Sequence, residues 1–244
     1  MLKKFKQKVI CIIPARGGSK GILKKNIYPV NKRPLIYYTI KSAILSGVCD
    51  KIIVYTDCDR IAKISKKYGA EVPFRRPKKI SGSLATTEKT LKCALLQAEK
   101  FYKTNFDICV FLAPTNIFRK ISWIKKAVNN LKQDRRLDSS FSVHQLYKHF
   151  WTTEKKTKKK VCKWMKNYTS RQIAPKLYRE DTGLASATRS KFWRIGKRIG
   201  IKNKFIINND SFTGIDIHDI NDIKLAEYGL KILLKKKEKD MILN

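Results

Sequence analysis

Residues 9–26 read VICIIPARGGSKGILKKN, an apolar run followed by a loop rich in glycine and basic residues. The apolar run, residues 9–13, is short, contains β-branched residues and lacks polar alternation. It therefore predicts a strand of a parallel sheet that is buried on both faces. The loop leaves the carboxyl end of this strand, which is the edge where open α/β sheets bind their ligands. We expect a binding site there.

The residues of this loop favour a polyphosphate ligand. Its three glycines allow backbone N–H groups to approach an anion, and Arg16, Lys20 and Lys25 add positive charge around the same turn. Two common phosphate-binding loops are excluded by spacing, because neither GxxxxGK[ST] nor GxGxxG can be read in this stretch.

The composition limits the class of protein without choosing its partner. The chain has 244 residues, of which 43% are hydrophobic, so it is long enough to bury a full core. Its 55 basic and 19 acidic residues give a formal net charge of +36. A field of this sign steers nucleotides, sugar acids and pyrophosphate toward a cleft, and it attracts nucleic acid as readily. No RRM, KH, zinc or helix-turn-helix signature is present, so no specific nucleic-acid partner is predicted.

The cysteines and the amino terminus predict a cytoplasmic protein. The six cysteines form no CxxC pair and mostly lie in apolar or helical patterns, so we expect buried, reduced thiols. They are Cys11, Cys49, Cys58, Cys93, Cys109 and Cys162. The first apolar run is too short for the core of a signal peptide, and no run is long enough to span a membrane. No membrane partner is therefore expected.

Predicted strands and helices alternate along most of the chain, which is typical of a doubly wound α/β sheet. Strands are predicted at residues 51–56, 71–74, 106–112, 139–143, 205–207 and 214–217, and the α/β pattern returns at 184–188 after an interruption. Helices are predicted at residues 34–45, 86–102, 121–131 and 220–234, with another that ends at Tyr68 and is capped by Asp57 or Asp59. A solvated lysine tail follows the last helix.

The interruption, residues 144–179, predicts an inserted arm that carries a hairpin. It contains a run of lysines and no stripe of apolar residues at helical spacing. Trp151, Trp164 and Met165 are expected to be exposed on this arm. An apolar surface of this kind is usually buried against a partner, so we expect a second subunit to cover it.

The first loop, IIPARGGSKGxxxKN, resembles the signature loop of the acylneuraminate cytidylyltransferases, the CMP-sialic acid synthetase family. Further segments resemble the motifs of this family and follow in its order. They are Arg76-Pro77 with residues 85–87 (ATT), residues 111–119 (FLAPTNIFR), Arg171-Gln172 with Tyr178-Arg179, and residues 215–218 (IDIH) with Asp222 and Ala226-Glu227.

The resemblance implies a fold, a reaction and an assembly. The fold would be a Rossmann-like, doubly wound α/β fold with a mostly parallel sheet, of the nucleotide-diphospho-sugar transferase type. Residues 1–143 and 180–244 would form the nucleotidyltransferase domain, and residues 144–179 the dimerisation arm of a homodimer. The reaction would join CMP from CTP to the anomeric hydroxyl of a sialic-acid-like nonulosonic acid and release pyrophosphate, with Mg²⁺ as the cofactor.

The resemblance also implies residue roles. Arg16 and Lys25 would hold the triphosphate and stabilise the leaving pyrophosphate, and Asp216 would bind Mg²⁺, so these three are the catalytic candidates. The residues implied to bind CTP are Ala15, Arg16, Gly17, Ser19, Lys20, Lys25, Asn26, Arg76, Ala85, Thr86 and Thr87. The residues implied to bind the sugar are Thr115, Lys148, Arg171, Gln172 and Phe205, with Lys148 reaching the site of the neighbouring subunit.

The chain departs from the family pattern mainly around the sugar and the metal. His218 lies where the family has a second metal carboxylate; either Asp219 replaces that carboxylate, His218 suits a softer ion such as Mn²⁺, or the second metal site is weakened. Ser83 replaces an aspartate, Ala113 a glutamine and Ser186 a tyrosine, and Asp181-Thr182-Gly183 carries one extra residue. The sequence therefore predicts the activity better than the substrate.

Several alternatives remain open at this level. Pseudaminate and legionaminate are possible acceptors, whereas Kdo is disfavoured because its enzymes have a different first loop. The departures at Ala113 and His218 would also suit a non-catalytic relative that binds a nucleotide sugar.

Overall fold

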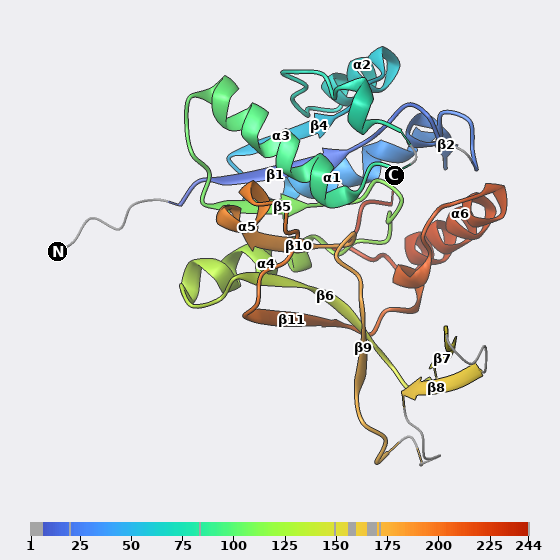
Figure 1. The fold of residues 1–244 in the computed structure, drawn as a ribbon. Helices are drawn as coiled ribbons and strands as arrows, with labels where there is room; N and C mark the ends of the chain where they lie inside the picture. Colours follow the sequence, from blue (N-terminus) through green and yellow to red (C-terminus); the bar gives the residue numbers. More distant parts are fainter. Residues whose placement is uncertain are drawn as a thin grey trace.

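The computed structural model of the chain describes residues 7–19, 21–82, 84–148, 150–155, 160–164, 170 and 172–243. Its central feature is a seven-stranded sheet with the order β11-β6-β10-β5-β1-β4, to which β9 is added beside β6 (Figure 1). The strands are β1 (Val9–Pro14), β4 (Lys51–Tyr55), β5 (Ile108–Phe111), β6 (Ser139–Leu146), β9 (Leu177–Glu180), β10 (Ser186–Arg189) and β11 (Asn203–Asn208).

The sheet is mostly parallel, as predicted. β1 pairs in parallel with β4 and β5, and β6 pairs in parallel with β11. β10 is antiparallel to both β5 and β6, so it alone runs against the other strands between β11 and β4, and β9 is antiparallel to β6. β1 lies between two parallel neighbours and is buried from Val9 to Ile13, which confirms the strand expected from the apolar run.

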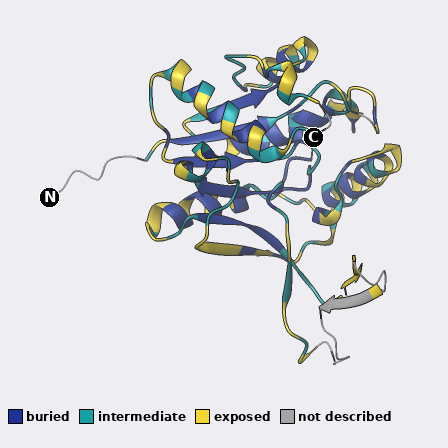
Figure 2. Cartoon of the chain, viewed as in Figure 1, coloured by how far each residue is buried: buried dark blue, intermediate teal, exposed yellow. Residues whose placement is uncertain are grey.

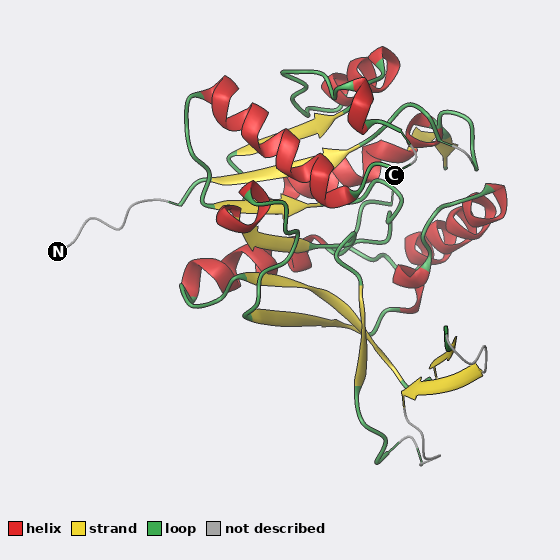
Figure 3. Cartoon of the chain, viewed as in Figure 1, coloured by secondary structure: helices red, strands yellow, loops and turns green. Residues whose placement is uncertain are grey.

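Helices cover both faces of the sheet (Figure 3). Alternate residues of β1 belong to two different cores, because successive side chains of a strand point to opposite faces. Val9, Cys11 and Ile13 share a core with α1, α2 and α4, whereas Ile10 and Ile12 share one with α3 and α5. The helices are α1 (Leu35–Ser46), α2 (Asp59–Lys67), α3 (Thr87–Tyr102), α4 (Ile121–Gln133), α5 (Ser190–Arg194) and α6 (Ile220–Lys235).

A third core joins the segment around Val30 and Leu35 to the carboxyl-terminal part of the chain. α6 packs through Leu230 and its apolar neighbours against Val30, Leu35 and Phe118. The short strands β2 (Pro29–Val30) and β3 (Arg33–Pro34) form a small antiparallel pair beside it. Buried positions follow the sheet and the inner sides of the helices (Figure 2). Among the described residues, no helix has the length and apolar character that crossing a membrane requires.

Four local predictions are wrong. Residues 71–74 form no strand, since only Glu71 makes a bridge, to Ile53. Residues 214–217 lie in no strand either; the 3₁₀ turn η3 (Ser211–Gly214) precedes an irregular segment there. Neither predicted aspartate caps α2, because Cys58 occupies the cap position and makes no capping bond through its side chain. The tail after α6 is not wholly solvated, because residues 241–243 pack against the third core.

The arm begins within the main sheet. β6 continues to Leu146 and pairs there with β9, so residues 144 and 179 both lie within strands. Beyond them, β7 (Phe150–Thr153) and β8 (Lys160–Trp164) form an antiparallel hairpin that projects from the body of the molecule (Figure 1). Trp151 is 59% exposed, as predicted. Met165 and the side chain of Trp164 lie outside the described residues.

A buried arginine joins the loops at the carboxyl end of β5. Arg119 is fully buried, and its guanidinium donates to the carbonyl oxygens of Ala113 at 2.8 Å and Gly183 at 2.7 Å. It also donates to the carbonyl of Leu184 and, at 3.0 Å, to the hydroxyl of Thr39. Burial lowers the pKa of Arg119 to about 9, which leaves it charged at neutral pH. One cation thus fixes two loops and α1.

We expect Arg119→Met to lower the free energy of unfolding by about 3–5 kcal/mol, because it removes the donor that several buried oxygens share. In a chain of this size, that loss corresponds to a fall in unfolding temperature of roughly 6–20 °C. Differential scanning calorimetry measures the unfolding temperature. Arg136→Met is the control, because Arg136 is exposed and its side chain pairs with Asp134 at the surface. Equal unfolding temperatures for the two variants would contradict the role given to Arg119.

Candidate active site

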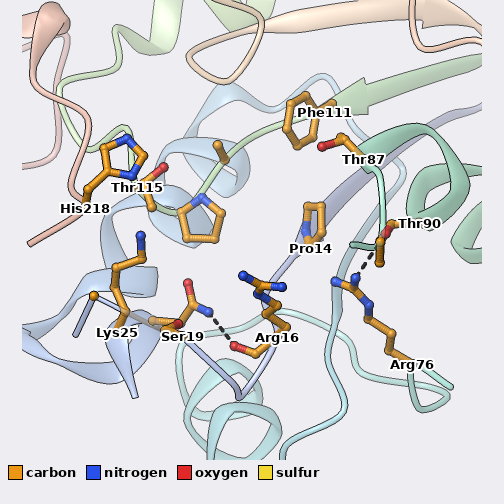
Figure 4. Close-up of a pocket in the computed structure, with 15 residues that line it drawn as sticks. Pro14, Arg16, Ser19, Lys25, Arg76, Thr87, Thr90, Phe111, Thr115 and His218 are labelled. Carbon is orange, nitrogen blue, oxygen red and sulfur yellow. Dashed lines mark hydrogen bonds between the residues drawn. The ribbon is translucent and has the colours of Figure 1, made fainter. Parts of the chain in front are cut away.

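A cavity of about 510 Å³ opens at the carboxyl edge of β1 and β5 (Figure 4). It lies where the sequence predicted a ligand site, because the loops after both strands line it. Figure 4 shows the side chains of Arg16 and Lys25 extending into it from the loop after β1. Its lining residues are Pro14, Arg16, Ser19, Gly21, Lys25, Asn26, Arg76, Ala85, Thr87, Thr90, Phe111, Ala113, Pro114, Thr115 and His218.

Two hydrogen bonds hold the loop after β1 in place. The buried amide of Asn26 donates to the carbonyl oxygen of Arg16 at 2.9 Å, which joins the two ends of the loop. The N–H of Gly17 donates to Asp57 Oδ1 at 2.8 Å. This carboxylate follows β4, so the loop is tied to the neighbouring strand. Gly17, which was predicted to bind CTP, does not line the cavity.

Lys25 joins this loop to the segment before α6. Its ammonium donates to the carbonyl oxygen of Ile217 at 2.8 Å. Burial lowers the pKa of Lys25; Asp216 counteracts part of this shift and Arg16 adds to it. The same two segments also meet at Gly21, where an added Cβ would lie 2.3 Å from the carbonyl oxygen of His218. Only glycine allows this approach without a displacement of backbone.

Arg76 shapes the opposite end of the cavity. It is buried, and its guanidinium donates to the carbonyl of Ile80 and, at 3.1 Å, to the hydroxyl of Thr90 on α3. Burial lowers the pKa of Arg76. Arg16 donates to the carbonyl of Gly82 at 2.9 Å, so it crosses from the first loop to this one. Thr86 forms the amino-terminal cap of α3.

The two residues predicted to bind a metal ion, Asp216 and His218, lie between β11 and α6. His218 Nε2 lies 3.1 Å from Asp216 Oδ2, while Asp216 Oδ1 is shielded from solvent and has no hydrogen-bond partner among the described residues. Asp219 is engaged elsewhere, since its Oδ1 caps α6 by accepting from two backbone N–H groups. Within the described part of the chain, no group of three or more metal-ligating side chains occurs.

This donor set fits Mg²⁺ with one protein carboxylate. Magnesium is commonly held by one or two carboxylates, and water and substrate phosphates supply its other ligands. The unpartnered Oδ1 of Asp216 meets that requirement. Asp219 suits the ion less well, because it lines neither cavity and its Oδ1 already caps α6.

A second cavity of about 460 Å³ adjoins the first. The two share Phe111, Ala113 and Thr115, and Asp216 faces the second cavity whereas His218 faces the first. A reacting pair of substrates placed in the two cavities would therefore meet beside Thr115 and Asp216. The remaining residues that line the second cavity are Asn116, Arg179, Glu180, Asp181, Thr182, Gly183, Leu184, Arg198, Thr213 and Gly214.

The structure gathers most of the predicted nucleotide-binding residues. Arg16, Ser19, Lys25, Asn26, Arg76, Ala85 and Thr87 line the first cavity, and Thr115 lines both. Ala15 is buried behind the loop. Lys20, Ser83 and Arg171 lie outside the described residues.

Three predicted sugar-binding residues do not line either cavity of this single chain. Lys148 and Gln172 are exposed, and Phe205 packs on β11 against the rings of Phe141 and Tyr178, with centroids 5.3 and 5.5 Å apart. The sugar-binding roles of all three, and the reach of Lys148 to a neighbouring subunit, stay predictions.

Sequence reasoning missed several residues of the second cavity, Arg198 above all. It lies in the loop after α5, a helix that was not predicted, and no motif surrounds it. Ser186 belongs to the sheet instead: it is buried on β10 and lines neither cavity.

Comparisons with known proteins agree with this geometry. The family model described as cytidylyltransferase matches residues 10–232. CMP-N,N'-diacetyllegionaminic acid synthase of Campylobacter jejuni is 31% identical over 227 residues, which cover 92% of this chain and 95% of the relative. N-acylneuraminate cytidylyltransferase of Escherichia coli is 37% identical over 124 residues, 51% of this chain and 28% of the relative.

A solved structure supports the fold. CMP:2-keto-3-deoxy-manno-octonic acid synthetase complexed with CTP superposes with a TM-score of 0.66 at 12% identity, over 95% of this chain and 100% of that one. This likeness confirms the predicted fold class.

We expect Gly21→Ala to lower the affinity for CTP about tenfold or more, because the new Cβ would displace the backbone of His218 at a cost of about 1–3 kcal/mol. Gly214→Ala is the matched control, since a Cβ at Gly214 meets no atom within 4 Å and Gly214 does not line the first cavity. Isothermal titration with CTP compares the two variants. Equal affinities would show that the contact between the two segments does not shape the nucleotide site.

Proposed function

This chain belongs to the cytidylyltransferase family, and we propose that it transfers CMP from CTP to the anomeric hydroxyl of a sialic-acid-like nonulosonic acid and releases pyrophosphate. The observation that carries the proposal is the pair of joined cavities. One is lined by the loop after β1 and by Arg76, and the other by polar side chains that suit a sugar. They meet at Thr115, where the hydroxyl of the acceptor would reach the α-phosphorus.

The residues of the first cavity suit a nucleoside triphosphate. Arg76 lies at the end that we assign to base and ribose, Lys25 lies at the other end near Thr115 and His218, and Arg16 lies between them (Figure 4). Phosphoryl and nucleotidyl transfers depend mainly on positioning and on the neutralisation of developing charge. Arg16 and Lys25 would align the triphosphate and stabilise the charge that develops on pyrophosphate as it leaves.

We expect Lys25→Ala to lower kcat by on the order of 10²-fold or more, because a cation that stabilises the transition state is lost. Lys32→Ala is the control, since Lys32 is an exposed lysine in the turn between β2 and β3. Steady-state assays with saturating CTP measure both. A Lys25→Ala enzyme within a few-fold of the wild type would rule out this role.

The pH profile gives a second readout for Lys25. Because burial lowers its pKa, Lys25 loses its proton at a lower pH than a free lysine, and activity should fall on the alkaline side. Lys25→Arg keeps the charge to higher pH, because the pKa of arginine lies well above that of lysine. In the Lys25→Arg variant, the fall of kcat on the alkaline side should therefore occur at a higher pH than in the wild type, even if the maximal kcat is lower.

We propose that Asp216 binds Mg²⁺ through Oδ1 and that His218 orients this carboxylate through Oδ2. A bound Mg²⁺ would neutralise charge on the triphosphate and on the leaving pyrophosphate. The position of Asp216 supports this role, because it lines the acceptor cavity next to Thr115. Mn²⁺ remains an alternative ion.

We expect Asp216→Asn to lower kcat by on the order of 10²-fold, since it removes the charge that binds the ion. Asp219→Asn is the control: asparagine caps a helix about as well as aspartate, so this variant should fold and keep its activity. Assays over a range of Mg²⁺ concentrations measure both variants. If Asp219→Asn were the inactive variant, the metal ligand would be Asp219.

A diacetylated nonulosonic acid is the second candidate acceptor. The observation that favours it is the extent of similarity, because the legionaminic acid synthase aligns along nearly the whole chain, and the N-acylneuraminate enzyme along about half. Ala113, which lines both cavities, is small and leaves room for a different substituent.

The test of the proposed function is an assay of pyrophosphate release. Purified protein is incubated with CTP, Mg²⁺ and, in turn, N-acetylneuraminate, pseudaminate, legionaminate and Kdo, and the products are identified by mass spectrometry. A CMP-sugar from one nonulosonic acid supports the proposal and names the acceptor. CTP binding without turnover of any acid would favour a non-catalytic protein that binds nucleotide sugars.

We propose a homodimer, with the arm as part of its interface. Large apolar side chains are exposed on the arm, Phe150 and Trp151, and on β11, Phe205 and Ile207. Exposed apolar residues of this size are commonly covered by a partner. Sedimentation equilibrium tests the proposal, and a monomer with full activity would contradict it.

We also propose the cytoplasm as the location. The cysteines whose side chains are described are free thiols, which agrees with a reducing compartment. Fractionation of cells with an antibody against the chain tests this, and recovery of the protein outside the cytoplasmic fraction would contradict it.

A further inference from the structure

Arg198 is a cation of the second cavity whose hydrogen-bonding capacity is only partly used. One terminal nitrogen donates to Glu180 Oε1 at 2.7 Å. Its Nε is shielded from solvent and has no hydrogen-bond acceptor among the described residues, and the nearest carboxylate oxygen given for it, Glu88 Oε1, lies 3.6 Å away. A shielded N–H without an acceptor is unusual in proteins and leaves a donor for a ligand.

The backbone of Arg198 is fixed from two sides. Its carbonyl oxygen accepts from the hydroxyl of Thr188 on β10 at 3.0 Å and from the indole N–H of Trp193 at 3.0 Å. Trp193 is only 1% exposed and belongs to the core beneath α3. The guanidinium therefore starts from a rigid position, which is a requirement for selective binding.

The other arginine of the cavity differs at Nε. Arg179 Nε and one terminal nitrogen donate to the two oxygens of Asp181 at 2.9 and 3.1 Å. This bidentate pair has the geometry that arginine and carboxylate prefer. Of the two arginines, Arg198 is thus the one whose Nε has no hydrogen-bond acceptor among the described residues.

The charges around Arg198 favour a neutral ligand atom. Three carboxylates, Glu180, Asp181 and Asp216, line the cavity with the two arginines, and Glu88 lies beside Arg198. Glu180 and Glu88 both lie beside Arg198, so the carboxylate of the acceptor would be repelled from this position. A carbonyl oxygen accepts from Arg198 without that repulsion. An acylated amine also offers an N–H, which the carboxylate of Glu180 suits as an acceptor.

We propose that Arg198 is a specificity-determining residue that donates from Nε to the carbonyl oxygen of an N-acyl group on the acceptor sugar. This inference rests on the proposed function and deepens it, because it names the part of the acceptor that the second cavity recognises. The position of the cavity fits: it meets the nucleotide cavity at Thr115, and Arg198 is a further lining residue of it.

The experiment compares two acceptors with the wild type and with Arg198→Met at saturating CTP. One acceptor is the N-acylated acid with the highest turnover in the panel above, and the other carries a hydroxyl in place of the acylamino group. The wild type should prefer the acylated acid at least about tenfold in kcat/KM, since one hydrogen bond to a charged donor is at stake. Arg198→Met should reduce this preference to less than about threefold and leave the KM for CTP unchanged.

Two further variants separate recognition from structural damage. Lys197→Met removes an exposed positive charge from the same loop and should keep the wild-type preference. Arg198→Met with Glu180→Gln removes the unpaired carboxylate that the single variant leaves behind. If Arg198 acted only by neutralising Glu180, this double variant would recover the preference, and the inference would be overturned.

The remaining outcomes distinguish a failure of this inference from a failure of the proposed function. An unchanged preference in Arg198→Met, or an equal loss for both acceptors, would overturn the inference and leave the proposed function standing. A wild type that turns over both acceptors with equal kcat/KM would also overturn the inference and leave the proposed function standing. A wild type that turns over no nonulosonic acid would instead overturn the proposed function and the inference with it.

Discussion

The guanidinium of Arg119 is the contact on which the geometry of both cavities depends. The sheet places antiparallel β10 next to β5, so the turn that enters β10 lies beside the loop that leaves β5. Both segments expose carbonyl oxygens to the interior, and Arg119 donates to Ala113, Gly183 and Leu184 at once. A buried charge is costly unless it is fully hydrogen-bonded. The loops are therefore held in the one arrangement that satisfies it.

Cationic side chains also bind backbone carbonyls around the first cavity. Arg16 and Lys25 donate to backbone carbonyls of distant segments, at Gly82 and Ile217, and Arg76 donates to Ile80 in its own loop and to the hydroxyl of Thr90 on α3. Side chains suited to a triphosphate thus also hold the walls of the cavity together. Burial lowers the pKa of Lys25 and Arg76, since the charged form loses solvation there. The net charge of +36 acts differently, as a field over the surface.

Errors of prediction occurred where short segments depend on distant contacts. Residues 214–217 have the apolar character of a strand, but their backbone meets another loop, as Ile217 N–H donates to Thr115 at 3.2 Å. Asp57 has the chemistry of a helix cap, yet its carboxylate accepts from Gly17. Residues 241–243 follow a run of lysines and still pack on the core beneath α6. In each case a tertiary contact replaced the local preference.

The sequence alone determined the parallel strand β1, the alternation of strands and helices and the position of a basic, glycine-rich loop after β1, because these depend on local periodicity and on residues close together in the chain. The tertiary structure decided the acceptor side. Arg179, Arg198 and Asp216 converge on one cavity from three separate segments. Whether Asp219 caps a helix or binds a metal, and whether a guanidinium keeps a free donor, depends on neighbours that only the folded chain supplies.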